Sequence, residues 1–350
     1  MMAESTTSSS SVASPSLPVP SLAWADSALI LTAIVAALAK VAGVLIVPGM
    51  RGVASQAAID NVELASSTLS YATLALFVAL AATGSFLLAR EARVGLGTRA
   101  TVIALTGLEL ALASPAAVSR LHTLATLMLA IMTSLLALVA AAGSMRTPHT
   151  RMLAVVMTTL AASGLMRPVS WEMTAFAADR ANVTLFQTGY VLAGAAVVAF
   201  ALATLLAAAW IGTRSPWRGR LLANVAIGLA LALTYLAARE TNGERSAFEA
   251  ILRASLLHAT AGALPSTLIT IAAFLQPASI LLALVVLLQK APPPAVKAVF
   301  AFALLSGGGF DVPLQAMAIA AASVWLLLAT ANPHAMWVAL AREREEGNRS

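Results

Sequence analysis

Ser306-Gly307-Gly308-Gly309-Phe310-Asp311-Val312-Pro313 interrupts an otherwise continuous apolar run near the end of the 350-residue chain. A single glycine inside a helix costs about 1 kcal/mol relative to alanine, so three in a row disfavour a continuous helix here. The break separates a short hydrophobic segment, 295–305, from a full-length one, 312–331. We therefore expect two helices joined by a turn, with the rest of the chain packed around such breaks and a few buried charges.

The composition is typical of a membrane protein. The chain is 60% hydrophobic and 10% charged, whereas a soluble domain has roughly 25% charged residues. Hydrophobic windows of about 18 residues or more recur along the chain, and each is long enough to cross a hydrocarbon layer of about 30 Å. The net charge is +6, but the basic residues are scattered over short loops and form no patch with interleaved aromatic residues. We expect the lipid bilayer as the main partner, and no nucleic acid.

The hydropathy predicts an all-α, polytopic bundle of about ten transmembrane helices. Small residues, alanine above all, favour close packing between them. The fifth and ninth spans are short, at about 15 residues or roughly 22 Å of helix. The predicted spans are 27–48, 64–89, 100–118, 121–143, 152–166, 184–212, 221–238, 266–289, 295–309 and 312–331.

The connections between the spans predict the orientation. Cytoplasmic loops of membrane proteins carry the excess of Lys and Arg. Alternate connections here carry several bases each, starting with Arg90, Arg93 and Arg99, whereas acids largely balance the bases in the others. We therefore expect both ends of the chain on the cytoplasmic side.

Three segments outside the spans have their own character. Residues 1–22 are rich in Ser, Thr and Pro, which predicts a disordered tail, followed by the bundle over 23–334 and a short charged tail over 335–350. Residues 246–249 match a helix capping box, and apolar residues follow at helical spacing. They predict a helix on the outer surface, with a lid over a pathway as the alternative. The Arg167-Pro168 and Trp171-Glu172 pairs are predicted to lie in an outer loop at the membrane interface.

Two ionisable residues lie inside predicted spans, Lys40 in the first and Glu109 in the third. A charge near the bilayer centre costs at least about 2.5–3.5 kcal/mol, so each needs a partner or a function. Helix rise places them about 12 Å and about 14 Å from the outer ends of two spans that run in the same direction. This match favours an ion pair, or a site for which a proton, ion or substrate competes. The alternative is that Lys40 extends to the interface and Glu109 is protonated or bonded to a threonine.

Asp311 and Gln276 complete the set of candidate residues for a substrate or ion pathway. Asp311 follows the three glycines and precedes Pro313, a pattern typical of a helix N-terminus. The functional interpretation is a broken helix whose carboxylate and free backbone groups line a cavity and bind a cation or a polar substrate. Gln276 precedes Pro277 in the eighth span, and this proline and Pro115 in the third span predict kinks.

Several kinds of chemistry find no support in the sequence. The chain has no cysteine, which excludes disulfides, thiol catalysis and thiolate metal sites. The four histidines lie in separate segments without metal-ligand spacing. No metalloprotease helix, P-loop or paired aspartate cluster is present either. We expect no cofactor and no metal, and an enzyme is disfavoured.

Three functional classes remain for this integral membrane protein, which we expect in a bacterial inner membrane. The first is a secondary transporter or permease for a small solute or ion, with Lys40, Glu109 and Asp311 near its pathway. The second is a non-catalytic subunit or scaffold with membrane-protein partners, in which the buried charges only fix the packing. The third is an intramembrane enzyme, for which no acid, base and nucleophile converge in the sequence.

Overall fold

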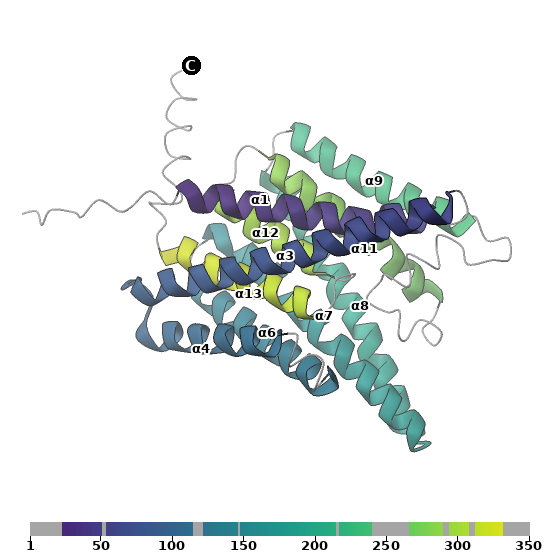
Figure 1. Cartoon of the computed structure of the whole chain (residues 1–350), viewed down its shortest axis with the longest axis horizontal. Coiled ribbons are helices and arrows are strands. Elements are labelled where there is room, and N and C mark those ends of the chain that lie inside the picture. Colours follow the sequence, from purple (N-terminus) through teal and green to yellow (C-terminus); the bar gives the residue numbers. More distant parts are fainter. Residues whose placement is uncertain are drawn as a thin grey trace, which may run out of the picture.

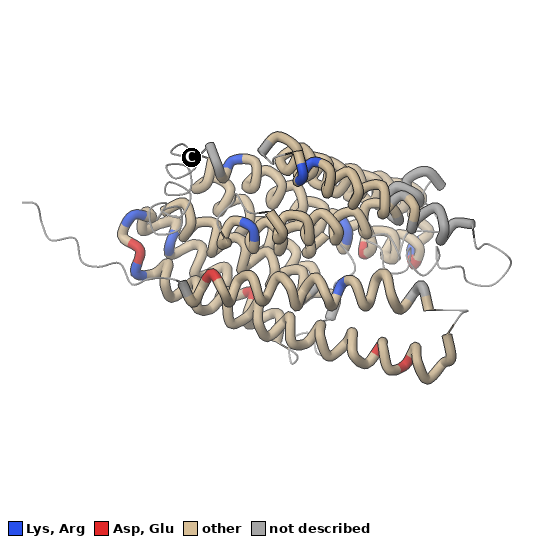
Figure 2. Tube along the Cα trace, turned by 90° about the horizontal axis from the view of Figure 1, so that it is seen from above, with Lys and Arg blue, Asp and Glu red and all other residues tan. Residues whose placement is uncertain are grey.

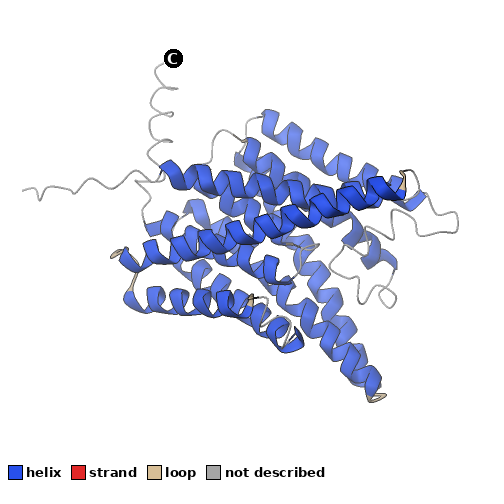
Figure 3. Ribbon diagram, viewed as in Figure 1, coloured by secondary structure: helices blue, strands red, loops and turns tan. Residues whose placement is uncertain are grey.

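The computed structural model describes residues 23–50, 54–114, 122–145, 148–214, 217–239, 266–289, 294–307 and 312–331. In these ranges almost all residues are helical and none lies in a strand, and the helices pack side by side (Figures 1 and 3). The helices are α1 (Ala23–Lys40), η1 (Val41–Ile46), α2 (Val47–Met50), α3 (Gln56–Arg90), α4 (Leu96–Leu112), α6 (His122–Ser144), α7 (Pro148–Asp179), α8 (Val183–Arg214), α9 (Trp217–Arg239), α11 (Ser266–Leu288), α12 (Pro294–Ser306) and α13 (Val312–Ala331).

The predicted all-α membrane bundle is confirmed. Six helical stretches in the described part of the chain are long and apolar enough to cross a membrane, by length and composition: α1 with η1, α3, α6, α7, α8 and α13. Each predicted span overlaps a helix, but α4 has only 17 residues and α12 only 13. These lengths correspond to about 26 Å and about 20 Å of helix, less than a hydrocarbon core of about 30 Å. The count of ten spans therefore stays a prediction.

The two helices beside the glycine break lie at the centre of the bundle. α12 packs against α1, α11 and α13, and α13 packs in addition against α3 and α6 (Figure 1). In α13, 89% of the membrane-spanning stretch is buried inside the protein, against 33% in α3. The most central helices are thus surrounded by protein, and the outer helices face the lipid.

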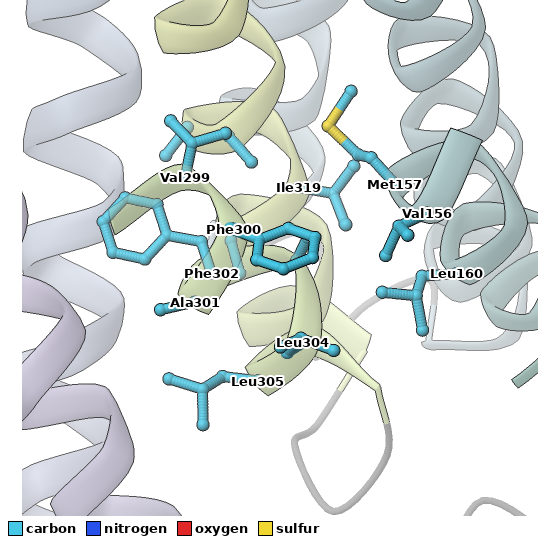
Figure 4. Packing of buried hydrophobic residues seen from close by; sticks show 14 of the residues in the cluster. Val156, Met157, Leu160, Val299, Phe300, Ala301, Phe302, Leu304, Leu305 and Ile319 are labelled. Atoms are coloured by element: carbon cyan, nitrogen blue, oxygen red, sulfur yellow. The ribbon is translucent and has the colours of Figure 1, made fainter. Parts of the chain in front are cut away.

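Aromatic side chains fix α12 against helices that are distant in sequence. Phe302 meets Phe77 of α3 edge to face, with ring centroids 5.0 Å apart, and Phe300 lies 4.9 Å from Trp210 of α8. Such pairs contribute roughly 0.5–1.5 kcal/mol beyond the area that they bury. Figure 4 shows Ile319 of α13 and Met157 of α7 in the same apolar cluster.

The predicted break at the triple glycine is confirmed at its edges. α12 ends at Ser306, whose hydroxyl donates to the Ala303 carbonyl at 2.7 Å, and α13 begins at Val312. Gly307 lies against α8, where an added Cβ would come within 2.1 Å of Cε2 of Phe200. A larger residue at this position would have to displace a buried aromatic ring. Residues 308–311, which include Asp311, lie outside the described part of the chain.

α13 also approaches α3 and α6 closely through glycine. A Cβ at Gly84 in α3 would lie 2.7 Å from Val324, and one at Gly143 in α6 would lie 2.6 Å from Leu327. The close approach lets the Trp325 indole Nε1 donate to the Leu80 carbonyl across the interface, at 3.0 Å. Small residues at helix contacts are what close packing in a membrane requires.

The prediction of a short fifth span with an outer loop after it is wrong. α7 continues through Pro168 and ends only at Asp179, so Arg167 and Trp171 lie in a helix and not in a loop. A proline removes one backbone hydrogen bond, and packing against a neighbouring helix can offset that loss. α8 supplies this packing. Gly189 of α8 has no side chain, and Thr174 of α7 lies within 2.5 Å of the position that a Cβ of Gly189 would take.

The α3–α4 turn and the end of α13 lie at the same end of the bundle. Nη1 of Arg93 donates to the Ala331 carbonyl at 3.3 Å. Figure 2 shows several Lys and Arg at this end, which the sequence assigns to the cytoplasmic side, and others farther along the bundle. The orientation itself stays a prediction. The predictions for the N-terminal tail, the surface helix at 246–249 and the C-terminal tail lie outside the described residues, as does the kink at Pro115.

Candidate functional site

The bundle buries the three candidate residues that the structure describes. Lys40, Glu109 and Gln276 each have at most 1% of their surface exposed. Lys40 therefore does not extend to the interface, which was the alternative interpretation of its sequence position. Gln276 lies in α11 beside Pro277, and its backbone carbonyl accepts a hydrogen bond from the Ser279 hydroxyl at 2.9 Å.

α4 turns a mostly polar face toward the protein. Its buried residues are Val102, Thr106 and Glu109, at positions i, i+4 and i+7 of one helical stripe. The neighbouring Leu108 is 45% exposed, on the side that faces the lipid. Because lipid tails solvate apolar side chains as well as a protein core does, the polar residues decide which side of this helix turns inward.

The Glu109 carboxyl lies beside the side chain of Thr133 in α6. The Thr133 hydroxyl donates its proton to the Leu129 carbonyl at 2.6 Å, so it does not donate to Glu109. Within the described residues, neither carboxyl oxygen of Glu109 forms a hydrogen bond of good geometry. The Thr106 hydroxyl forms none either. The side chains of Glu109 and Thr133 are thus neighbours, but they are not joined by a hydrogen bond of good geometry.

Thr133 also forms part of the wall of a cavity between α6, α7 and α13. The cavity has about 260 Å³ of space between atoms, counted together with the clefts that lead out of it. Its narrow interior has room for roughly one water molecule. The amide of Gln315 in α13 and the backbone of Gly164 in α7 face the same space, and a Cβ at Gly164 would lie 2.6 Å from Nε2 of Gln315.

Lys40 lies where the first helix changes its winding. α1 ends at Lys40 and continues as the π-helical segment η1, after which the Val47 amide donates to the Ala42 carbonyl, five residues back. Pro48 follows directly and has no N–H to continue the α-helical pattern. Single π-turns inside α-helices occur frequently at functional sites. Gly43 lies in this turn, and its missing side chain leaves room for the Ser66 hydroxyl of α3.

Arg167 of α7 is a charged residue that acts on Lys40, and two positive charges at these positions repel each other. The hypothesis of a Lys40–Glu109 ion pair fails in this structure, because neither carboxyl oxygen of Glu109 has a partner among the described residues. α3 packs against both α1 and α4 and therefore lies between the two helices. Helix rise predicts that Lys40 and Glu109 lie at a similar depth in the membrane, but it gives no information on whether their helices are neighbours.

Polar groups nevertheless lie at intervals between the two regions across the bundle. Thr133 contacts Glu109 and shares the cavity with Gln315, which packs on Gly164. Arg167 follows Gly164 by one helical turn on the same face of α7 and acts on Lys40. We call this set the polar track, and it consists of Glu109, Thr133, Gln315, Arg167 and Lys40.

Three members of the polar track were not identified from the sequence. Arg167 was assigned to a loop because Pro168 resembles a helix boundary. Thr133 and Gln315 are single uncharged polar residues in apolar helices, and these are common wherever membrane helices bond to one another. The available signal was Gly164, three residues before Arg167, since a glycine inside a membrane helix often marks a close approach by a neighbour.

Comparison with known proteins gives no further guide. No family model matches the chain, and neither a curated protein nor a solved structure matches it.

Proposed function

We propose that this chain is a secondary transporter or permease that moves a small solute or ion across a membrane, with the polar track in its pathway. The observation that supports the proposal is the burial of Glu109 and Lys40 at the two ends of a row of polar side chains. Ionisable residues that face the interior of a membrane bundle typically mark ion or proton pathways, because each costs several kcal/mol to insert.

The size of the cavity limits what the closed bundle can hold. With room for roughly one water molecule beside Thr133, the interior fits a small ion or ordered water and not a bulky solute. A larger substrate requires the helices around the cavity to separate. The helix break at Gly307 and the π-helical turn after Lys40 are two places in the described part of the chain where the backbone departs from regular α-helix.

Two further assignments belong to this proposal. Asp311 and Gln276 are proposed as pathway residues on the sequence evidence, with Gln276 buried beside Pro277 in α11. Placement in a bacterial inner membrane is likewise proposed.

Water access to the polar track tests the proposal. The chain has no cysteine, so single thiols introduced by Glu109→Cys, Thr133→Cys and Lys40→Cys are unique reporters. In sealed vesicles, a hydrophilic maleimide added to one side or the other is expected to label at least one of the three. Leu108→Cys, one residue from Glu109 but facing the lipid, is the matched control and should stay unlabelled. Shielding of all three thiols from both sides would remove the transport proposal.

A non-catalytic membrane subunit or scaffold is the second candidate. The narrow cavity beside Thr133 favours it, because the cavity has room for roughly one water molecule only. In that case the polar track fixes the helix packing, and the three thiols stay shielded while substitutions along the track change stability. Copurification of a stoichiometric membrane-protein partner would support this candidate.

A further inference from the structure

The surroundings of Glu109 fit a neutral carboxylic acid better than a carboxylate. Glu109 is fully buried in α4, and a buried carboxylate needs several hydrogen-bond donors or a cation nearby. No partner donates to either carboxyl oxygen among the described residues. The adjacent hydroxyl of Thr133 has a single proton, and it is committed to the Leu129 carbonyl at 2.6 Å.

A threonine hydroxyl that already donates its proton can only accept further hydrogen bonds. A hydrogen bond between Glu109 and Thr133 therefore needs its proton from the glutamic acid, as O–H to Oγ1 of Thr133. The second carboxyl oxygen can accept from the Thr106 hydroxyl, which lies one turn away on the same buried stripe and has no other partner in the described structure. Both carboxyl oxygens are satisfied in this way only when Glu109 carries a proton.

Among the described residues, no charged side chain compensates an ionised Glu109. α4 packs against α3, α6 and α13, and no charge from these helices acts on Glu109. α13 has no ionisable residue in its described length. In α3, α6 and α4 itself, the other ionisable residues lie near the helix ends or outside the buried stripe that contains Glu109. They are Asp60, Glu63, Tyr71 and Arg90 in α3, His122 in α6 and Arg99 in α4.

We propose that Glu109 is a proton-binding site, which holds a proton on its carboxyl in the closed bundle and releases it to water that enters the cavity beside Thr133. The geometry supports the release path, since Thr133 contacts Glu109 on one side and lines the cavity on the other. The inference rests on the proposed function and identifies the proton as the ion that moves along the pathway. A metal cation fits less well, because no group of three or more acidic, histidine or cysteine side chains gathers within the described residues.

Labelling with dicyclohexylcarbodiimide, an apolar reagent that modifies protonated carboxyl groups, tests the inference directly. The full-length protein in liposomes is treated near neutral pH, and peptide mass spectrometry locates the modification. We expect label on Glu109 and none on Asp60 or Glu63, and we expect the label on Glu109 to fall as the pH is raised. Through the loss of one hydrogen bond, Thr133→Val should lower the pH at which the label on Glu109 falls by half by about 0.7. Thr133→Ser keeps the hydroxyl and should label like the original protein.

Several outcomes would overturn the inference. They are no label on Glu109 in the original protein, the same pH dependence of labelling in Thr133→Val and Thr133→Ser, or protection of Glu109 by added sodium at constant pH, which indicates a metal-cation site. Because the original protein is mapped by peptide, the test does not depend on a Glu109 variant that folds. The labelling reads the carboxyl itself and the thiol experiment reads water access. Label on Glu109 together with shielded thiols would therefore reject transport and the release of the proton to water but keep the protonated carboxyl, and unlabelled Glu109 with accessible thiols would reject the proton alone.

Discussion

α4 and α12, with 17 and 13 residues, are both shorter than a typical membrane span, and they differ in what holds them in place. α12 is buried on all sides, and its side chains between Ala295 and Ser306 are almost all apolar. α4 is buried along one stripe only, and two of the three residues in that stripe are Thr106 and Glu109. Shape complementarity positions α12, whereas the need to remove polar groups from lipid positions α4.

The comparison shows that burial and polarity are separate properties in a membrane bundle. In water, apolar surface drives a helix to the centre, but in lipid an apolar helix gains little by being surrounded by protein. The centre of this bundle is filled by helices whose small and aromatic residues fit closely, as Gly307 fits against Phe200. A peripheral helix contributes the buried acid.

The largest effect is expected from a permanent charge on the inner face of α4. Glu109→Arg places an always-charged side chain beside Thr133, without an acid among the described neighbours, and should cost about 3 kcal/mol or more. Glu109→Gln, which resembles the neutral acid in size and hydrogen bonding, should change stability by less than about 1 kcal/mol. Thermal unfolding in detergent measures both variants. Equal losses of stability in the two variants would show that the fold needs Glu109 in its ionised form and not in its neutral form.

The next effect tests the packing of α12 at its end. Gly307→Val requires the Phe200 ring to move, because a Cβ would lie 2.1 Å from it, and overpacking of this kind costs about 1–3 kcal/mol. Gly107→Ala in α4 is the control, since nothing lies within 4 Å of the added carbon. It should leave stability unchanged or raise it by up to about 1 kcal/mol. A similar loss in both variants would mean that α4 is packed as closely as α12.

A smaller effect distinguishes like charges from opposite charges around Lys40. In the double-mutant cycle of Lys40→Met with Arg167→Met, relief of repulsion is counted in each single variant but occurs once in the double variant. The double variant should therefore be less stable than the sum of the single effects by about 1 kcal/mol. The cycle of Lys40→Met with Glu109→Gln should be additive within about 0.5 kcal/mol, because α3 separates the two helices. Strong coupling in the second cycle would show that Lys40 and Glu109 interact, as the hypothesis of an ion pair requires.

The smallest effect concerns the one hydrogen bond that α13 donates to α3 from its indole. Trp325→Phe removes the bond from Nε1 to the Leu80 carbonyl and keeps an aromatic ring of related shape. Interhelical hydrogen bonds in membranes average about 0.6 kcal/mol, so the loss of stability should be of that order. Chemical denaturation measured by fluorescence is unsuitable for this tryptophan variant, and circular dichroism should be used. A loss well above about 2 kcal/mol would show that polar bonding and not close packing holds the centre.

Much of the fold follows from hydropathy, and the helix break at the triple glycine follows from backbone chemistry. The burial of Glu109 could be predicted because a charge in lipid is costly whatever helix carries it. The neighbours of Lys40 could not, since hydropathy gives the depth of a residue and not its direction around the helix axis. Arg167 was missed because the cost of Pro168 is local, whereas the packing of α8 that offsets it comes from residues later in the chain.

Electron paramagnetic resonance of α4 tests most directly whether lipid lies on one side of this helix and the polar track on the other. A nitroxide is attached to Leu108→Cys or to Glu109→Cys in liposomes, and its collision rate with oxygen, which concentrates in lipid, is measured. The structure predicts frequent collisions at 108, where the side chain is 45% exposed, and infrequent ones at 109, where it is fully buried. Equal rates at the two positions, or a higher rate at 109, would contradict the inward placement of Glu109 on which the proposed pathway depends.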